Sequence, residues 1–230
     1  MTALRVENVQ VDIGDQTLLK DISLHVQKGS VLALLGHNGA GKSTFLRTIM
    51  GMNEKTKGSI EVCGHNIDTA FLEYKRNISY LPEEPMLLSE LTVYQHFQMY
   101  GLAYKMNEDL LNKRINAYIA AFELEDKRDH YPEELSKGMR QKVQAICACL
   151  PDVPLLLIDE PFMGLDIYAM EYMEQMMRQK ASEGVTIIIS SHQLERIRDI
   201  ADEFILLQQG ECIESGAIDT FDTIKRGSDL

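Results

Sequence analysis

The stretch "LLGHNGAGKSTFLRT", residues 34–48, decides which fold class this chain adopts. Within it, residues 36–43 fit the phosphate-loop pattern GxxxxGK[ST] in full. In that pattern the glycines let backbone N–H groups approach phosphate oxygens, and the positive end of the following helix favours the anion. An apolar run over residues 31–35 precedes the loop, and a helical pattern follows it. We therefore expect a buried strand, a nucleotide-binding loop and a helix, in this order.

Two residues of the loop carry most of its expected chemistry. Lys42 is expected to reach the terminal phosphates of the nucleotide, and the hydroxyl of Ser43 is expected to bind Mg²⁺. A chance glycine-rich turn would leave this Lys-Ser pair unexplained, whereas His37 is expected to be only a loop residue. The loop residues expected to contact the nucleotide are Gly36, Asn38, Gly39, Ala40, Gly41, Lys42, Ser43 and Thr44.

The second half of a metal site follows in "LLLIDE", residues 155–160. Its four apolar residues predict a buried strand that ends at Asp159. This carboxylate is expected to hold Mg²⁺ through water, and Glu160 is expected to lie beside the γ-phosphate. A carboxylate at that place can orient and deprotonate an attacking water molecule.

A second anion-binding helix end is predicted by "LSKGMRQKV", residues 135–143. Ser136 is a good helix cap, and Gly138 keeps the first helical turn free of a side chain. One γ-phosphate needs only one cradle, so a second helix end of this kind suggests a second face for the nucleotide. Alone, the stretch could equally be an ordinary capped helix.

The remaining pattern is that of an α/β chain. The first 62 residues or so indicate strands and tight turns, and Thr92 with Gln95 predicts a capping box that opens a helix through about Met99. From residue 155, strand and helix alternate as in a parallel sheet, with Asp166 capping one helix. Further expected features are a cap at Asn107, a core-facing helical stripe of Leu111, Ile115, Tyr118, Ile119 and Phe122, and a hairpin at Gln209 and Gly210.

Together these motifs resemble the nucleotide-binding subunits of ABC transporters over nearly the whole chain, to about Gly216. "LSKGM" is similar to the family signature LSGGQ, in which Ser136 and Gly138 match while Lys137 and Met139 depart. "GLD", ending at Asp166, matches the D-loop of the family, and "SSH", ending at His192, matches its switch histidine. All the motifs occur in the order of the family.

The resemblance implies a fold and an assembly. The fold is α/β: a P-loop NTPase (RecA-like) core, an N-terminal antiparallel β subdomain and an inserted α-helical subdomain at roughly residues 86–150. One ABC-type domain is expected over residues 1–220, followed by a tail of unknown role at 221–230. Two subunits would lie head to tail, so that Lys42 of one and the signature of the other, residues 136–139, enclose one ATP with Mg²⁺. Catalytic residues would be Glu160 and His192.

Two positions differ from the family pattern. Where an aromatic residue usually stacks on adenine, "VDIGD" supplies Ile13, which places the base selectivity in question. Where the Q-loop glutamine is expected, "ISYLPEEP" supplies Glu83, a candidate Mg²⁺ ligand directly or through water. The chain resembles the branch of the family dominated by export pumps.

Composition narrows the classes of partner. The 230 residues are 45% hydrophobic and 25% charged, and the net charge of -12 argues against nucleic acid as a partner. No stretch approaches the roughly 20 apolar residues of a membrane-spanning helix, and the N-terminus lacks the apolar core of a signal peptide. We expect a cytoplasmic protein held at the cytoplasmic face of the cell membrane by a transmembrane partner. The four cysteines are expected to be small buried side chains: Cys63, Cys147, Cys149 and Cys212.

The leading hypothesis is an ATPase subunit that drives a separate transmembrane subunit, with an identical or related second nucleotide-binding subunit. The alternative is a soluble ABC-type ATPase that acts on ribosomes, nucleic acid or another cytosolic complex. Such proteins usually carry two ATPase units or long inserted arms, and this chain has one motif set. A regulatory subunit without catalysis is disfavoured by Glu160 and His192, and a GTP switch by the absence of an NKxD motif.

Overall fold

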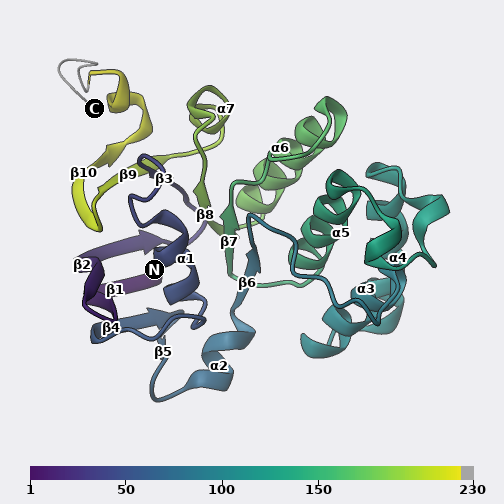
Figure 1. Ribbon diagram of the computed structural model, residues 1–230, viewed down its shortest axis with the longest axis horizontal. Helices are drawn as coiled ribbons and strands as arrows, with labels where there is room; N and C mark the ends of the chain where they lie inside the picture. The colour runs from purple at the N-terminus through teal and green to yellow at the C-terminus, as the bar shows by residue number, and fades with distance from the viewer. Residues whose placement is uncertain (224–230) are drawn as a thin grey trace.

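The computed structural model describes residues 1–223, which form two β-sheets flanked by helices (Figure 1). One sheet has four strands in the order β2-β1-β4-β5, and the other has six in the order β10-β9-β3-β8-β7-β6. From residue 224 onward, the predicted C-terminal tail lies outside the described residues. The α/β fold class expected from the sequence is confirmed.

The smaller sheet is antiparallel and is built from the N-terminal part of the chain. Strand β1 (Thr2–Ile13) pairs with β2 (Gln16–Gln27) on one side and with β4 (Lys57–Val62) on the other. Strand β5 (His65–Asn66) extends the sheet beyond β4. The apolar residues that alternate along β1 are buried against the larger sheet and α1 (Lys42–Ile49), so one face of the small sheet closes one of the two cores.

The larger sheet places the ends of three buried strands at one edge. Strands β3 (Val31–Leu35), β7 (Leu155–Asp159) and β8 (Thr186–Ser190) are parallel and buried along their whole length, as is typical of a sheet covered on both faces. Asp159 lies opposite Ser190 in the register of β7 and β8. The edge strands are β6 (Ile78–Leu81) and the antiparallel β10 (Glu211–Ala217), and β9 (Glu203–Gln208) lies between β10 and β3. The phosphate loop therefore begins at the carboxyl end of β3, at the same end of the sheet as Asp159 and Glu160, which stand at the carboxyl end of β7.

Four helices begin at side-chain caps that the sequence predicted. Thr92, Asn107, Ser136 and Asp166 each accept the backbone N–H three residues on, at 2.9–3.3 Å. They open α3 (Val93–Ala103), α4 (Glu108–Ala121), α5 (Lys137–Cys149) and α6 (Ile167–Ser182). Shorter elements are α2 (Phe71–Arg76), α7 (Leu194–Arg198) and the 3₁₀ turns η1 (Glu125–Lys127), η2 (Pro132–Glu134) and η3 (Ile218–Thr223).

Helix α3 is longer than predicted, because it continues past Met99 to Ala103. Gly101 lies inside it, although glycine weakens a helix. A Cβ atom at this position would lie 2.2 Å from Cδ2 of Leu111, so the glycine is what allows α4 to approach α3. The sequence shows the glycine but not the helix that crosses it.

Helices α3, α4 and α5 lie together on one side of the larger sheet (Figure 1). The predicted stripe on α4 is confirmed as core: its aliphatic members and Phe122 are buried, and Tyr118 packs partly buried beside them. These residues join the same apolar cluster as β3, β7 and α6. The boundaries of the helical subdomain, residues 86–150, stay a prediction.

The expectation for the cysteines is wrong at two of the four positions. Cys147 and Cys149 are buried on α5, but Cys63 is half-buried and Cys212 is exposed. Cys63 lies in the turn between β4 and β5, and Cys212 lies next to a register shift on the edge strand β10. Turn and edge positions face solvent whatever residue occupies them. No helix within residues 1–223 is long and apolar enough to cross a membrane.

Candidate nucleotide-binding site

The predicted phosphate loop, Glu83 and the two residues predicted to be catalytic, Glu160 and His192, meet around one polar cavity of about 540 Å³. Within the described residues, those that line it come from segments far apart in the sequence, namely β2, the phosphate loop with the start of α1, and three loops: Leu18, Asn38, Gly39, Gly41, Lys42, Ser43, Thr44, Glu83, Glu160, Met163 and His192. Gly36, Ala40 and Asp159 are not among the lining residues. A cavity of this size, with convergent polar groups at the ends of parallel strands, is typical of a ligand site in an α/β fold.

The helix that follows the loop has no side-chain cap. Gly41 occupies the cap position with φ of 106°, and it offers no side-chain hydrogen bond to the first turn of α1. This differs from the four side-chain-capped helices α3 to α6. The first N–H groups of α1 therefore keep their need for an acceptor at the cavity wall, which is what a bound phosphate supplies.

Glycine is required at the start of the loop. Gly36 has φ of 144°, and a Cβ atom there would lie 2.4 Å from the carbonyl oxygen of Leu207. The loop therefore passes directly against strand β9. That contact fixes where the cradle begins.

Lys42 is the cation of the cavity. Its Nζ donates to the carbonyl oxygens of Gly36 at 2.7 Å and His37 at 3.3 Å, and the residue is 7% exposed. The side chain thus folds back over the loop rather than extending into solvent. Ser43, the next residue, lines the same cavity.

Asp159 lies just behind the cavity wall. Its carboxylate is fully buried and accepts hydrogen bonds from Oγ of Ser190 at 2.5 Å and the hydroxyl of Tyr80 at 3.3 Å. Burial, and secondarily the charge of Asp159, raises the pKa of Tyr80, so the phenol keeps its proton and remains a donor. The two donors fix the carboxylate in place at the end of β7.

Glu160 is held in a strained conformation beside the cavity. Its φ of 49° lies in the left-handed region, and its backbone N–H donates to the carbonyl and hydroxyl oxygens of Ser190 at 3.1 and 3.2 Å. The side chain is 5% exposed. A non-glycine residue with positive φ costs free energy and is found disproportionately at functional sites.

The partner of Glu160 is His192, whose side chain is about half exposed. Nδ1 of His192 lies 2.8 Å from Oε1 of Glu160, and the backbone N–H of His192 donates to Oε2 at 3.3 Å. The Nδ1 contact has the distance of an ion pair but not the angle of a hydrogen bond, so Oε1 accepts no hydrogen bond from the described protein atoms. Oε1 is therefore held beside the imidazole without a hydrogen bond to it.

Burial dominates the proton affinity of Glu160. It raises the pKa of the carboxyl above its usual value, while the nearby His192 and Lys42 charges act in the opposite direction. Asp159, the adjacent buried acid, adds to the increase. A carboxylate whose pKa moves toward neutrality becomes a better general base.

The predicted signature does not line this cavity. Ser136 caps α5, and Gly138 packs so closely that a Cβ atom there would lie 2.6 Å from the carbonyl oxygen of Gly164. Lys142 of the same helix pairs with Asp166 at 2.7 Å, and this pairing lowers the pKa of the Asp166 carboxyl. Residues 136–139 thus form a second helix end, joined to the loop of Asp166 rather than to the cavity of Lys42.

Ile13 lies where β1 turns into β2 and is 59% exposed, but it does not line the cavity. Two apolar residues that do line it, Leu18 and Met163, were missed by sequence reasoning. Leu18 looks like an ordinary strand residue, and Met163 looks like a loop residue. Only the packing of β2 beside Gly41 and Gly210 shows that Leu18 faces the site.

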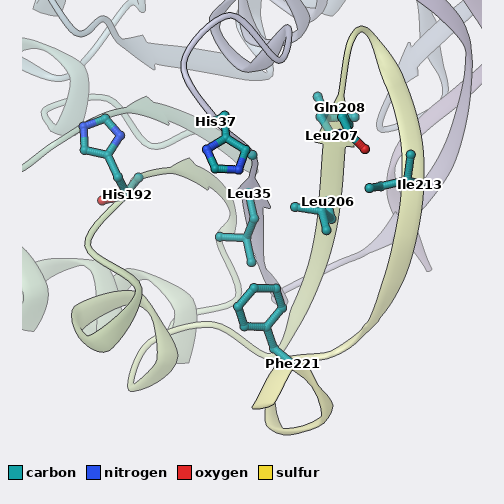
Figure 2. A pocket seen from close by; sticks show the side chains of 10 residues that line it. Leu35, His37, His192, Leu206, Leu207, Gln208, Ile213 and Phe221 are labelled. Atoms are coloured by element: carbon teal, nitrogen blue, oxygen red, sulfur yellow. The ribbon is translucent and has the colours of Figure 1, made fainter. Parts of the chain in front are cut away.

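An apolar pocket of about 260 Å³ adjoins the cavity, because His192 lines both. Figure 2 shows Leu35, Leu206, Ile213 and Phe221 turned toward this hollow, which the β9–β10 hairpin bounds. His37, expected to be a loop residue, is exposed and lies on the rim. The pocket offers few polar groups, so the polar cavity is the one suited to phosphates.

The comparisons with known proteins agree with this geometry. The profile of the family described as ABC transporter matches residues 19–163. The ABC-type transporter ATP-binding protein EcsA of Bacillus subtilis (strain 168) is 34% identical over 218 residues, covering 95% of this chain and 88% of that protein. The SkfA peptide export ATP-binding protein SkfE of the same organism is 28% identical over 222 residues, covering 96% and 92%. A solved structure, described as the ATP binding subunit of an ABC transporter, matches with a TM-score of 0.91 at 34% identity, covering 98% and 95%.

The chain therefore belongs to the ABC transporter family, as an ATP-binding subunit of its ATPase type. The resemblance drawn from the sequence motifs is confirmed at this level. The individual roles of the site residues stay predictions.

Proposed function

We propose that this chain hydrolyses ATP as one half of a head-to-tail dimer and drives export through a separate transmembrane subunit at the cytoplasmic face of the membrane. The observation that carries this proposal is the separation of two phosphate-type sites in one chain. The cavity at α1 holds Lys42 and Glu160, whereas the signature helix α5 begins elsewhere and contributes nothing to that cavity. A second copy would bring the two together.

In this proposal each residue has the chemical role that its surroundings favour. Lys42 and the uncapped N–H groups of α1 bind phosphate oxygens. Glu160 orients a water molecule and takes its proton on the carboxylate, and His192 holds the carboxylate in place. Ser43 and Glu83 line the cavity, and their hydroxyl and carboxylate oxygens are donors that suit Mg²⁺. The buried carboxylate of Asp159 would hold the ion through water. Bound Mg²⁺ would neutralise negative charge on the phosphates.

Exposed apolar side chains on the segment after Glu83 and on α3 support contact with a transmembrane partner on this side of the chain. Met86, Leu88 and Leu102 are 61%, 49% and 78% exposed, on the segment that follows Glu83 and on α3. In the resembled family, the helical lobe receives a helix from the membrane subunit. The relative SkfE is described as a peptide export ATP-binding protein, which supports export as the direction.

The experiment measures ATP turnover and partner capture together. Glu160→Gln is expected to retain ATP binding and to lose nearly all turnover, because an amide has no basic oxygen comparable to a carboxylate. Turnover at the unmodified rate would remove Glu160 from the role of base.

Capture from detergent-solubilised membranes tests the partner. The tagged chain is expected to retain a protein with several membrane spans, and Met86→Glu is expected to weaken this capture. Ile213→Glu, at a residue 47% exposed on the far hairpin, is the matched control and is expected to leave capture intact. Retention of a ribosome or another cytosolic complex instead would favour the soluble alternative.

A further inference from the structure

The loop that supplies Glu83 to the nucleotide cavity also reaches the signature helix. In the sequence "PEEP", residues 82–85, two prolines flank two glutamates. Glu83 lines the cavity, whereas Oε1 of its neighbour Glu84 lies 2.8 Å from Nζ of Lys137, the first residue of α5. Proline restricts both its own backbone and that of the preceding residue. The two adjacent carboxylates therefore belong to a stiff loop that serves two different sites.

Lys137 occupies an unfavourable place for a cation. The N-terminus of a helix carries the positive end of the helix dipole, so an anion stabilises it and a lysine does not. Ser136 satisfies only the N–H of Met139, through a hydrogen bond of 3.2 Å. A negative charge near this helix end is thus favoured twice, by the lysine and by the dipole. Glu84 supplies that charge within the chain.

Other contacts already hold this helix in place. Gly138 packs on the carbonyl oxygen of Gly164, and Lys142 pairs with Asp166. Farther along the loop, the backbone N–H of Met86 donates to Oε1 of Gln144 at 2.9 Å. The pair formed by Lys137 and Glu84 has side chains that are 53% and 67% exposed, whereas Lys142 is only 11% exposed. The exposed pair is therefore the contact that can be exchanged at least cost.

We propose that Glu84 is an internal counter-ion that competes with the γ-phosphate of ATP for Lys137. In the separate subunit, Lys137 is paired with Glu84. When two subunits close, Lys137 releases Glu84 and binds the γ-phosphate of the ATP held by the partner subunit. This inference rests on the proposed head-to-tail dimer. It adds that forming the dimer costs the free energy of breaking the ion pair between Glu84 and Lys137.

The effect of this ion pair on the dimer dissociation constant can be estimated. Breaking one exposed ion pair changes an equilibrium constant by a factor of about 1.4 to 5. A symmetric dimer breaks two such pairs, so removing Glu84 is expected to tighten the ATP-dependent dimer by about 2- to 30-fold. The effect must disappear when Lys137 is absent.

The test measures the dimer dissociation constant by analytical ultracentrifugation with ATP and Mg²⁺. Every protein carries Glu160→Gln so that ATP is retained. The set adds Glu84→Gln, Lys137→Ala and the double variant. Asp68→Asn is the control for charge, because it removes one negative charge from a carboxylate that is similarly exposed, at 56%, and that is also paired with a lysine, 2.7 Å from Nζ of Lys55. We expect Glu84→Gln to tighten the dimer more than Asp68→Asn does, Lys137→Ala to weaken it, and Glu84→Gln to add nothing in the absence of Lys137.

Three results would overturn the inference while leaving the dimer intact. These are equal constants for Glu84→Gln and Asp68→Asn, a weaker dimer in Glu84→Gln, and a Glu84→Gln effect that persists without Lys137. A weaker dimer would mean that the ion pair between Glu84 and Lys137 stabilises the closed dimer. If the Glu160→Gln protein forms no dimer with ATP, the composite site itself fails, and this inference fails with it.

Discussion

Gly138→Ala tests whether the signature helix must sit where the structure places it. The added Cβ atom would lie 2.6 Å from the carbonyl oxygen of Gly164, whereas ordinary contact begins at 3.4 Å. The Cβ atom is fixed rigidly to the backbone of α5 and the oxygen belongs to the backbone, so the start of α5 and the loop of Gly164 must separate by about 0.8 Å. A misplacement of about 1 Å in catalytic groups can cost about 100-fold in rate. We therefore expect ATP turnover to fall by roughly this factor.

The loss should be confined to turnover. Gly138 does not line the nucleotide cavity, so ATP affinity measured by calorimetry is expected to stay unchanged. Alanine favours a helix over glycine by about 1 kcal/mol, so the melting temperature is not expected to collapse. Gly216→Ala is the matched control, since its Cβ atom would meet side chains rather than backbone, with Oγ1 of Thr220 at 3.1 Å and the ring of Phe204 at 3.5 Å. Normal turnover in Gly138→Ala, or an equal loss in Gly216→Ala, would refute the reasoning.

Three further predictions concern residues predicted to act on the nucleotide. Ile13→Tyr is expected to tighten ATP binding by about 1–3 kcal/mol through base stacking; calorimetry showing no gain would mean that the base does not reach residue 13. Glu83→Gln is expected to retain ATPase activity but change its dependence on Mg²⁺ concentration, while Glu83→Ala loses more; superimposable curves would exclude Glu83 as a ligand. Because burial raises the pKa of Glu160, the stability that its proton provides is present at low pH and lost as the pH rises through that pKa. Glu160→Gln should therefore raise the melting temperature at neutral pH, with a gain that shrinks toward pH 4.5, the usual pKa of a glutamate; a gain independent of pH would contradict this.

Local sequence rules predicted the parts of this fold that are decided locally. A cap at Thr92, Asn107, Ser136 or Asp166 depends on the cap residue and the N–H groups that follow it, and all four were found where expected. The buried parallel strands can be recognised in the sequence as unbroken apolar runs, such as residues 155–158. The phosphate loop is a contiguous motif whose glycines are needed for backbone reasons. None of these features requires knowledge of a distant segment.

The unexpected features arise where distant segments touch. Gly101 permits the α3–α4 crossing, and Leu18 reaches the cavity only because β2 packs beside Gly41. The ion pair between Glu84 and Lys137 joins residues 53 positions apart. A single sequence shows both charges but gives no reason to pair them. The exposure of Cys63 and Cys212 likewise follows from a turn and an edge strand rather than from residue type.

The central claim, that each active site is shared by two subunits, can be tested by mixing two inactive variants. Lys42→Ala inactivates the phosphate loop but leaves the signature intact, and Gly138→Asp inactivates the signature but leaves the phosphate loop, the cradle of the nucleotide, intact. A mixed dimer then holds one complete site, made from the cradle of one subunit and the signature of the other. With half of the dimers mixed and one of two sites intact, turnover is expected to return to at most about a quarter of the unmodified rate.

The matched control mixes Lys42→Ala with Glu160→Gln. Both changes damage the cradle side, so no mixed dimer of these two contains a complete site. The decisive measurement is the ATPase rate of the two mixtures against the rates of their separate components. The account predicts restored turnover for Lys42→Ala with Gly138→Asp and none for Lys42→Ala with Glu160→Gln. Equal, unrestored rates in both mixtures would contradict a site shared between subunits.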